Sequence, residues 1–163
     1  MKQYIIARNN LNRRKKISVS KLKFRPSVYG LLFKDNKILL CPNWDGYDFP
    51  GGGMNIDETL EETLKREFWE ETGLRIEAGK LITCAQGFFH GRIEPILYWN
   101  SIFMYYLVRN PRGKITDKYF DQHEKTYAGL AEWIPTRQAL KLKFYNGVDS
   151  PALIKKALKL KNK

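Results

Sequence analysis

One segment of the chain, residues 60–72, has the periodicity of a helix and constrains the fold more than any other. Its apolar side chains recur every four residues, at Leu60, Leu64 and Phe68, and so fall on one helical face. Thr59 and Glu62 form the pattern of a capping box, in which each side chain satisfies a backbone amide of the first turn. Gly73 suits the left-handed conformation that ends many helices. The pattern therefore predicts a helix at Leu60–Thr72.

Runs of β-forming residues lie on both sides of this helix. Val28–Phe33 and Ile38–Cys41 are separated by turn residues of the Asp-Asn type, which predicts a β-hairpin. Further strands are expected at Tyr47–Phe49, Lys80–Gly87, Ile96–Val108 and Ala131–Ile134, and helices at about Thr136–Leu142 and from Ser150 onward. The order of strands, helix, strands and helix indicates an α+β or layered mixed-sheet fold.

The 163-residue length fits one compact domain. We expect this domain at residues 27–163, including the C-terminal helix, with residues 1–26 as a basic arm or first strand. No apolar run approaches the roughly 20 residues that cross a bilayer, and the N-terminus lacks a secretory pattern. With only two cysteines, Cys41 and Cys84, we expect a cytoplasmic protein without a membrane partner, and both thiols buried on strands.

The net charge of +12 is unevenly distributed along the chain. Residues 1–25 carry +9 and residues 137–163 carry +7, whereas residues 26–136 carry −4. Such basic ends fit a phosphate-rich partner, an anionic membrane surface or a role in solubility alone.

Acidic side chains crowd one side of the predicted helix. Glu67, Glu70 and Glu71 are three and four residues apart, so they share a helical face beside the apolar stripe. Like charges at this spacing repel, and a hard divalent cation would relieve the repulsion. The three glycines at 51–53 allow the backbone to approach an ion or phosphate closely, because they carry no side chain. A solvated acidic face is the alternative interpretation.

The segment from residue 52 to residue 74 resembles the Nudix box of the MutT-like pyrophosphohydrolases. It matches every fixed position of that motif, at Gly52, Glu58, Arg66, Glu67, Phe68, Glu70, Glu71, Gly73 and Leu74. The wider resemblance covers roughly residues 27–142. It implies an α+β fold of the Nudix type, an α/β/α sandwich with a mixed β-sheet and a carboxylate-rich catalytic helix.

The resemblance also implies a metal site and a reaction. Mg²⁺, with Mn²⁺ as an alternative, would be bound by Glu67 and Glu71, with Glu70 as a further ligand or as a base acting through water. The Gly51 carbonyl would be an additional ligand. Glu58 and Arg66 would orient the metal-binding carboxylates. A further carboxylate outside the box is expected at Glu124, and its competitors are Asp117, Asp121 and Glu94.

The substrate implied by the resemblance is a nucleoside diphosphate linked to a further group X, such as a nucleoside triphosphate, a nucleotide sugar or a dinucleoside polyphosphate. Candidate contacts are Phe88, Phe89, Tyr98 and Trp99 for base stacking, and Arg25 and Arg92 for phosphate. The basic ends make an RNA 5′ end an alternative substrate. A non-catalytic module that binds nucleotides or nucleic acid is a second alternative, and a homodimer is a possible assembly.

Overall fold

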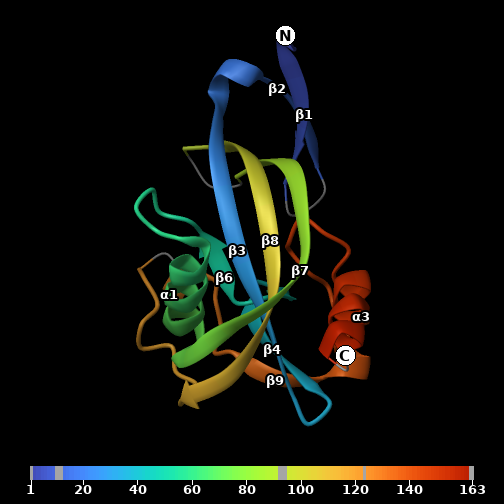
Figure 1. The fold of residues 1–163 in the computed structure, drawn as a ribbon. Coiled ribbons are helices and arrows are strands. Elements are labelled where there is room, and N and C mark those ends of the chain that lie inside the picture. Colours follow the sequence, from blue (N-terminus) through green and yellow to red (C-terminus); the bar gives the residue numbers. More distant parts are fainter. Residues whose placement is uncertain (1, 10–12, 92–94, 123, 162–163) are drawn as a thin grey trace.

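The computed structural model describes residues 2–9, 13–91, 95–122 and 124–161 (Figure 1). The strands are β1 (Tyr4–Arg8), β2 (Arg14–Ser18), β3 (Leu22–Lys34), β4 (Lys37–Asn43), β5 (Gly46–Asp48), β6 (Gly51–Gly53), β7 (Leu74–His90), β8 (Tyr98–Gly113) and β9 (Glu132–Pro135). The helices are α1 (Leu60–Thr72), α2 (Thr136–Ala139) and α3 (Ser150–Lys161), with short 3₁₀ turns η1 (Val19–Lys21) and η2 (Glu124–Thr126).

The strands form one mixed sheet. They run in the order β2-β1-β7-β8-β3-β4-β5, with β6 paired to β3 and β9 paired to β4. β3 and β8 are parallel, whereas β7 and β8 are antiparallel. Helices α1 and α3 lie on opposite sides of this sheet (Figure 1). The predicted α+β fold with a mixed sheet between helices is therefore confirmed.

Alternate side chains of β3 enter two separate hydrophobic cores, since successive side chains of a strand point to opposite faces. Leu31 joins the core that includes Ile154 of α3, and Leu32 joins the core that includes Phe68 of α1. All four side chains are at most 2% exposed. The continuous apolar run of this strand is thus explained by burial on both faces.

Helix α1 has the predicted bounds, and its predicted capping box is present. The Thr59 hydroxyl accepts from the Glu62 amide at 3.3 Å, and a Glu62 carboxylate oxygen accepts from the Thr59 amide at 2.8 Å. Gly73 ends the helix with φ at 75°. On the buried face, the Phe68 ring lies so close to Gly30 that a Cβ there would be 2.9 Å from it. These contacts fix the helix against the sheet.

Other elements differ in length from the predicted ones. The hairpin of β3 and β4 is confirmed, and its turn residues Asp35 and Asn36 have φ of 47° and 61°. β7 and β8 are longer than predicted, because they pair with one another along most of their length. The predicted helix at 136–142 is only one turn, α2. β3 begins at Leu22 and therefore crosses the boundary expected between residues 26 and 27.

The two cysteines differ in their surroundings. Cys41 on β4 is buried, as predicted, but Cys84 on β7 is exposed, so the prediction of a buried thiol is wrong there. The apolar residues around Cys84 indicate a strand but do not determine which side chains face outward. In the parts of the chain that the structure describes, no helix has both the length and the apolar character of a membrane span.

We expect the Thr59→Ala variant to be less stable than the wild type by about 1 kcal/mol, because the first turn of α1 loses its side-chain acceptor. Urea unfolding followed by circular dichroism measures this difference. Equal unfolding midpoints would show that the capping box does not stabilise the helix.

Candidate active site

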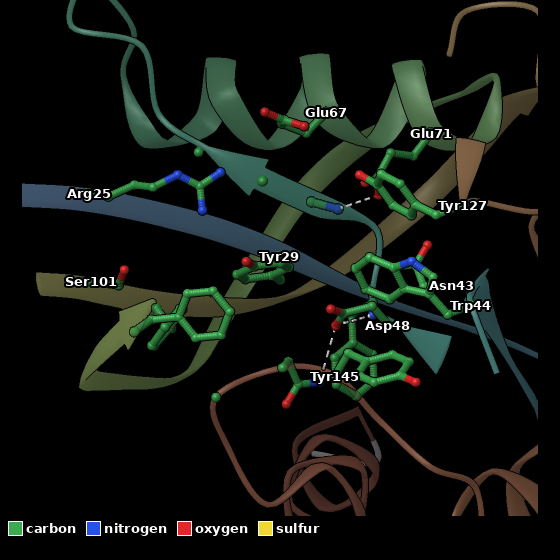
Figure 2. A pocket seen from close by; sticks show the side chains of 18 of the residues that line it. Arg25, Tyr29, Asn43, Trp44, Asp48, Glu67, Glu71, Ser101, Tyr127 and Tyr145 are labelled. Carbon is green, nitrogen blue, oxygen red and sulfur yellow. Dashed lines mark hydrogen bonds between the residues drawn. The ribbon is translucent and has the colours of Figure 1, made fainter. Parts of the chain in front are cut away.

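A cavity of about 410 Å³ opens between α1 and the strands that face it, and we call it the site cavity (Figure 2). Strands β3, β4, β5, β6, β7 and β8, helix α1 and four loops contribute to its wall. The lining residues are Arg25, Tyr29, Asn43, Trp44, Asp48, Phe49, Gly51, Gly52, Gly53, Glu67, Glu71, Phe89, Ser101, Phe103, Asp121, Tyr127, Tyr145, Asn146 and Gly147.

The three glycines of β6 bring backbone against two carboxylates of α1. Gly51 has φ of 146°, and its amide donates to Glu71 Oε2 at 2.9 Å. A Cβ at Gly52 would lie 2.4 Å from Glu67 Oε2. A Cβ at Gly51 would instead lie 2.2 Å from the Val28 carbonyl of β3. A side chain at Gly52 would therefore collide with Glu67, and one at Gly51 with the neighbouring strand.

Arg66 connects the acidic side chains of this region. Its Nη1 donates to Glu67 Oε1 at 2.8 Å and to Glu70 Oε2 at 3.0 Å. Its Nε and Nη2 donate to the two carboxylate oxygens of Glu58, the second at 2.8 Å. Nη2 also donates to the Gly53 carbonyl at 3.1 Å. One guanidinium thus offsets part of the charge of three carboxylates and ties α1 to β6.

The carboxylates differ in how strongly they prefer the ionised form. Hydrogen bonds from Arg66 lower the pKa of Glu58 to about 2. Burial raises the pKa of Glu67 and outweighs the opposing effect of Arg66. The Glu67 carboxylate is 13% exposed, so its ionised form is the costly one, and a bound cation would stabilise it.

The expected convergence of three glutamates is not observed. Within the described residues, no three His, Cys, Asp or Glu side chains come close enough together to hold a metal ion. Arg66 contacts Glu67 and Glu70, whereas the Gly51 amide contacts Glu71. Of the three glutamates, Glu67 and Glu71 line the site cavity. Their hard oxygen donors, beside a glycine backbone, nevertheless suit Mg²⁺, which usually takes only one or two carboxylates.

Aromatic side chains form the wall on the side of the cavity away from Arg25 (Figure 2). The rings of Trp44 and Tyr127 stack with centroids 4.8 Å apart, and Tyr145 meets Trp44 edge-on at 5.1 Å. Trp44 is 48% exposed, so an apolar surface remains open to a ligand. Such rings offer stacking surfaces for a planar group.

A polar pair lies beside this aromatic wall. Asp48 Oδ1 accepts from the Phe49 amide at 2.8 Å and from Asn146 Nδ2 at 3.2 Å. Burial raises the pKa of Asp48 from 3.8 to about 7. The carboxyl group is therefore protonated below neutral pH and can then donate a hydrogen bond.

The structure brings some of the predicted substrate residues to the cavity but not others. Arg25 and Phe89 line it. Phe88, Tyr98 and Trp99 do not line it; Trp99 instead lies under the Arg25 guanidinium, 5.7 Å from ring centre to Cζ. Among the candidate carboxylates outside the box, Asp121 lines the cavity and Asp117 does not. Arg92, Glu94 and the Glu124 side chain lie outside the described part of the chain.

Several lining residues escaped the sequence analysis: Trp44, Asp48, Tyr127, Tyr145 and Asn146. They are up to 102 positions apart in the sequence, and neither spacing nor periodicity connects them. The one usable signal was local: Trp44 lies in the turn before β5 and Asp48 ends β5 just before the glycine turn, and polar or aromatic residues near such loops often bind ligands.

Known proteins resemble this chain in sequence over part of its length and in fold over most of its length. RNA pyrophosphohydrolases of Pseudomonas fluorescens and Pseudomonas putida are 40% and 38% identical to it over 73 residues, which is 43% of this chain. The matched stretch is 46% of the length of those relatives.

Solved structures share the fold over most of the chain. The Escherichia coli ORF135 protein aligns with a TM-score of 0.62 and 19% identity, covering 89% of this chain and 96% of that protein. An ADP-ribose pyrophosphatase from Streptococcus suis aligns with a TM-score of 0.60 and 15% identity, covering 85% and 92%.

A family model described as NUDIX domain matches residues 23–154, which include the glycine turn, α1 and every residue that lines the site cavity. The resemblance that the box implied is therefore confirmed, and the chain belongs to the NUDIX domain family.

Proposed function

We propose that the chain is a hydrolase that depends on a divalent metal and cleaves the pyrophosphate linkage of a nucleoside diphosphate derivative. The observation that carries this proposal is a single cavity that joins two carboxylates of α1, a glycine backbone, a guanidinium and an open aromatic wall. Each part matches one chemical feature of such a substrate: the metal-bound phosphates, the remaining charge and the planar base.

The proposed metal ligands are Glu67, Glu71 and the Gly51 carbonyl, with Mg²⁺ as the ion and Mn²⁺ as an alternative. A bound divalent cation would neutralise phosphate oxygens and lower the pKa of a bound water. Glu70 is proposed as an additional ligand or as the base that accepts the proton of the attacking water. Asp121, which lines the cavity, and Glu124 are the proposed sources of a further carboxylate.

Arg66 and Glu58 are proposed to position the reacting groups without contacting the substrate. Arg66 contacts Glu67 and Glu70 and therefore restricts the rotamers of both. Glu58 holds the other edge of the same guanidinium in a bidentate pair. Such outer contacts orient metal ligands and raise metal affinity.

Arg25 and the aromatic wall are proposed to bind the two ends of the nucleotide. Arg25 lies beside Gly53, where a Cβ would be 2.7 Å from its Nη2, so its charge reaches the edge of the glycine turn. Trp44 and Tyr127 offer a stacking surface, and Asp48 offers a hydrogen-bond donor to the edge of a base when it is protonated.

A second candidate function is removal of pyrophosphate from the 5′ end of an RNA. It is favoured by two observations: curated relatives that match 43% of the chain are named RNA pyrophosphohydrolases, and the first 25 residues carry +9. The mechanism at the site cavity would be the same for both substrates. A homodimer and a cytoplasmic location stay predictions from the sequence.

Glu67→Gln, Glu70→Gln and Glu71→Gln are each expected to lower kcat by about 100-fold or more, because an amide binds Mg²⁺ more weakly and is not a base. The assay is release of phosphate or nucleotide from a panel of nucleoside triphosphates, nucleotide sugars, dinucleoside polyphosphates and 5′-triphosphorylated RNA. Glu61→Gln is the matched control, since Glu61 lies on the same helix, is 59% exposed and pairs with Lys65. Full activity in the three variants would exclude the mechanism.

Arg66→Lys is expected to raise the Mg²⁺ concentration for half-maximal activity by about 10- to 100-fold, because an ammonium cannot replace the bidentate contacts. Titration of activity with Mg²⁺ measures this change. Lys65→Arg, a change in the exposed neighbour, should leave the titration where it is. An unchanged midpoint in the Arg66 variant would contradict the positioning role.

Asp48→Asn is expected to be more stable than the wild type at pH 8 by an amount of order 1 kcal/mol, and to lose this advantage toward pH 4. The sign follows from the raised pKa: burial of the charged carboxylate costs stability above about pH 7, and the cost disappears as pH falls toward 3.8. Urea unfolding at a series of pH values tests it, and a difference independent of pH would refute the assignment.

A further inference from the structure

We propose that the β1–β2 hairpin binds single-stranded RNA that extends from the site cavity, a role that rests on the proposed function of that cavity. The hairpin lies before residue 23, where the family match begins, so the family does not account for it. Figure 1 shows it at one end of the sheet, beyond the strands that carry the site.

One face of the hairpin combines cations with exposed apolar groups. In the antiparallel register, Ile6 lies opposite Lys16 and Arg8 lies opposite Arg14, so these four side chains share a face with Tyr4. We call these five residues the hairpin face. Ala7 and Ile17, on the other face, are 0% and 4% exposed. One side of the hairpin is therefore buried through Ala7 and Ile17, and the hairpin face is the opposite side.

The exposed side chains of the hairpin face have the chemistry of a nucleic-acid surface. Tyr4 is 54% exposed and Ile6 is 53% exposed, which is more apolar area than a solvent-facing strand requires. Lys16 Nζ lies 4.8 Å from the centre of the Tyr4 ring. Alternating rings and cations bind single strands through base stacking and phosphate attraction.

The charge of the hairpin points to a polyanionic partner. Residues 2–21 contain seven lysines and arginines and no aspartate or glutamate. Basic side chains on an edge strand also hinder pairing with another chain, which disfavours a protein partner that adds a strand.

A second cavity, of about 450 Å³, lies between the hairpin face and residues that also line the site cavity. Ile6 and Arg8 of the hairpin face line it, together with Phe88 of β7 and Phe144 of the loop before α3. Five of its lining residues also line the site cavity: Phe89, Phe103, Tyr145, Asn146 and Gly147. The two cavities are therefore adjacent along a shared wall.

Contacts between the hairpin and β7 fix the position of the hairpin face relative to the two cavities. Arg8 of β1 pairs in parallel with Phe89 of β7, a residue that lines both cavities. His90 Nε2 lies 3.3 Å from the carbonyl of Arg13, the residue just before β2. A strand whose 5′ phosphates lie at Glu67 and Glu71 would thus pass through the second cavity and onto the hairpin face.

The binding test uses the full chain and a ten-nucleotide single-stranded RNA with a 5′ hydroxyl, which cannot be hydrolysed at its end. Fluorescence anisotropy without metal measures the affinity across salt concentrations. We expect the double variant Arg14→Ser/Lys16→Ser to bind about tenfold more weakly at low salt, with the salt slope reduced by about 1.4, because two phosphate contacts are lost. Tyr4→Ser should weaken binding about fivefold with an unchanged slope, because it removes only stacking.

The matched control is Lys155→Ser/Lys159→Ser, which removes the same charge from exposed positions of α3. Its affinity should equal that of the wild type. An equal loss in the two double variants would overturn the proposal, because binding would then follow total charge. Competition by a polyglutamate of matched charge as effective as that of RNA would also overturn it.

Activity separates this proposal from the proposed function. The hairpin variant should raise KM for a 5′-triphosphorylated ten-nucleotide RNA about tenfold and leave KM for ATP unchanged. If Glu71→Gln does not reduce hydrolysis, the proposed function fails while the anisotropy result still stands. If hydrolysis depends on Glu71 but the hairpin variant binds RNA as the wild type does, only the hairpin proposal fails.

Discussion

The site depends on the contact between an acidic helix and a glycine turn, which Arg66 makes possible. The Gly51 amide donates to Glu71, and Gly52 lies so close to the Glu67 carboxylate that a Cβ there would be 2.4 Å from Oε2. Negative charge packed so closely would destabilise the fold if it had no partner. The guanidinium contacts three carboxylates and the Gly53 carbonyl. It thereby offsets the repulsion between the carboxylates and ties α1 to β6. The remaining cost appears at buried Glu67, and this is the place where a cation is expected to be stabilising.

How much could be predicted from the sequence depends on whether a feature is local. The bounds of α1, its capping box and the glycine turn were predicted because caps and helical spacing act within a few residues. The aromatic wall was not predicted, since Trp44, Tyr127 and Tyr145 meet only after the sheet has formed. Trp99 was expected to contact a base and instead supports Arg25, because aromatic periodicity does not distinguish a ligand contact from packing. The expected trio of glutamates shares a helix side, but Arg66 and Gly51 direct the side chains to different partners.

The structure shows where the charges of each sign lie, which the composition alone does not. The net charge of +12 combines a negative candidate site with basic segments at both ends of the sequence. A polyanionic substrate would be attracted by the basic surroundings over a distance, and repelled by the carboxylates until a cation is bound. Under the proposed function, this arrangement would separate attraction from catalysis: the basic segments would attract the substrate, and a bound cation would allow it to react.

The parallel pairing of β3 with β8 has a consequence for how the molecule forms. Eleven pairs join these strands, from Leu22 with Tyr98 to Leu32 with Val108, and the partners in every pair are 76 residues apart in the sequence. During synthesis the chain must therefore extend past residue 98 before the centre of the sheet can begin to assemble. Helix α1 and the β3–β4 hairpin, which rely on near neighbours, can form earlier. Contacts of such long sequence separation slow folding, so the edge of β3 that pairs with β8 stays unpaired until β8 has been made and is open to misassembly in the interval.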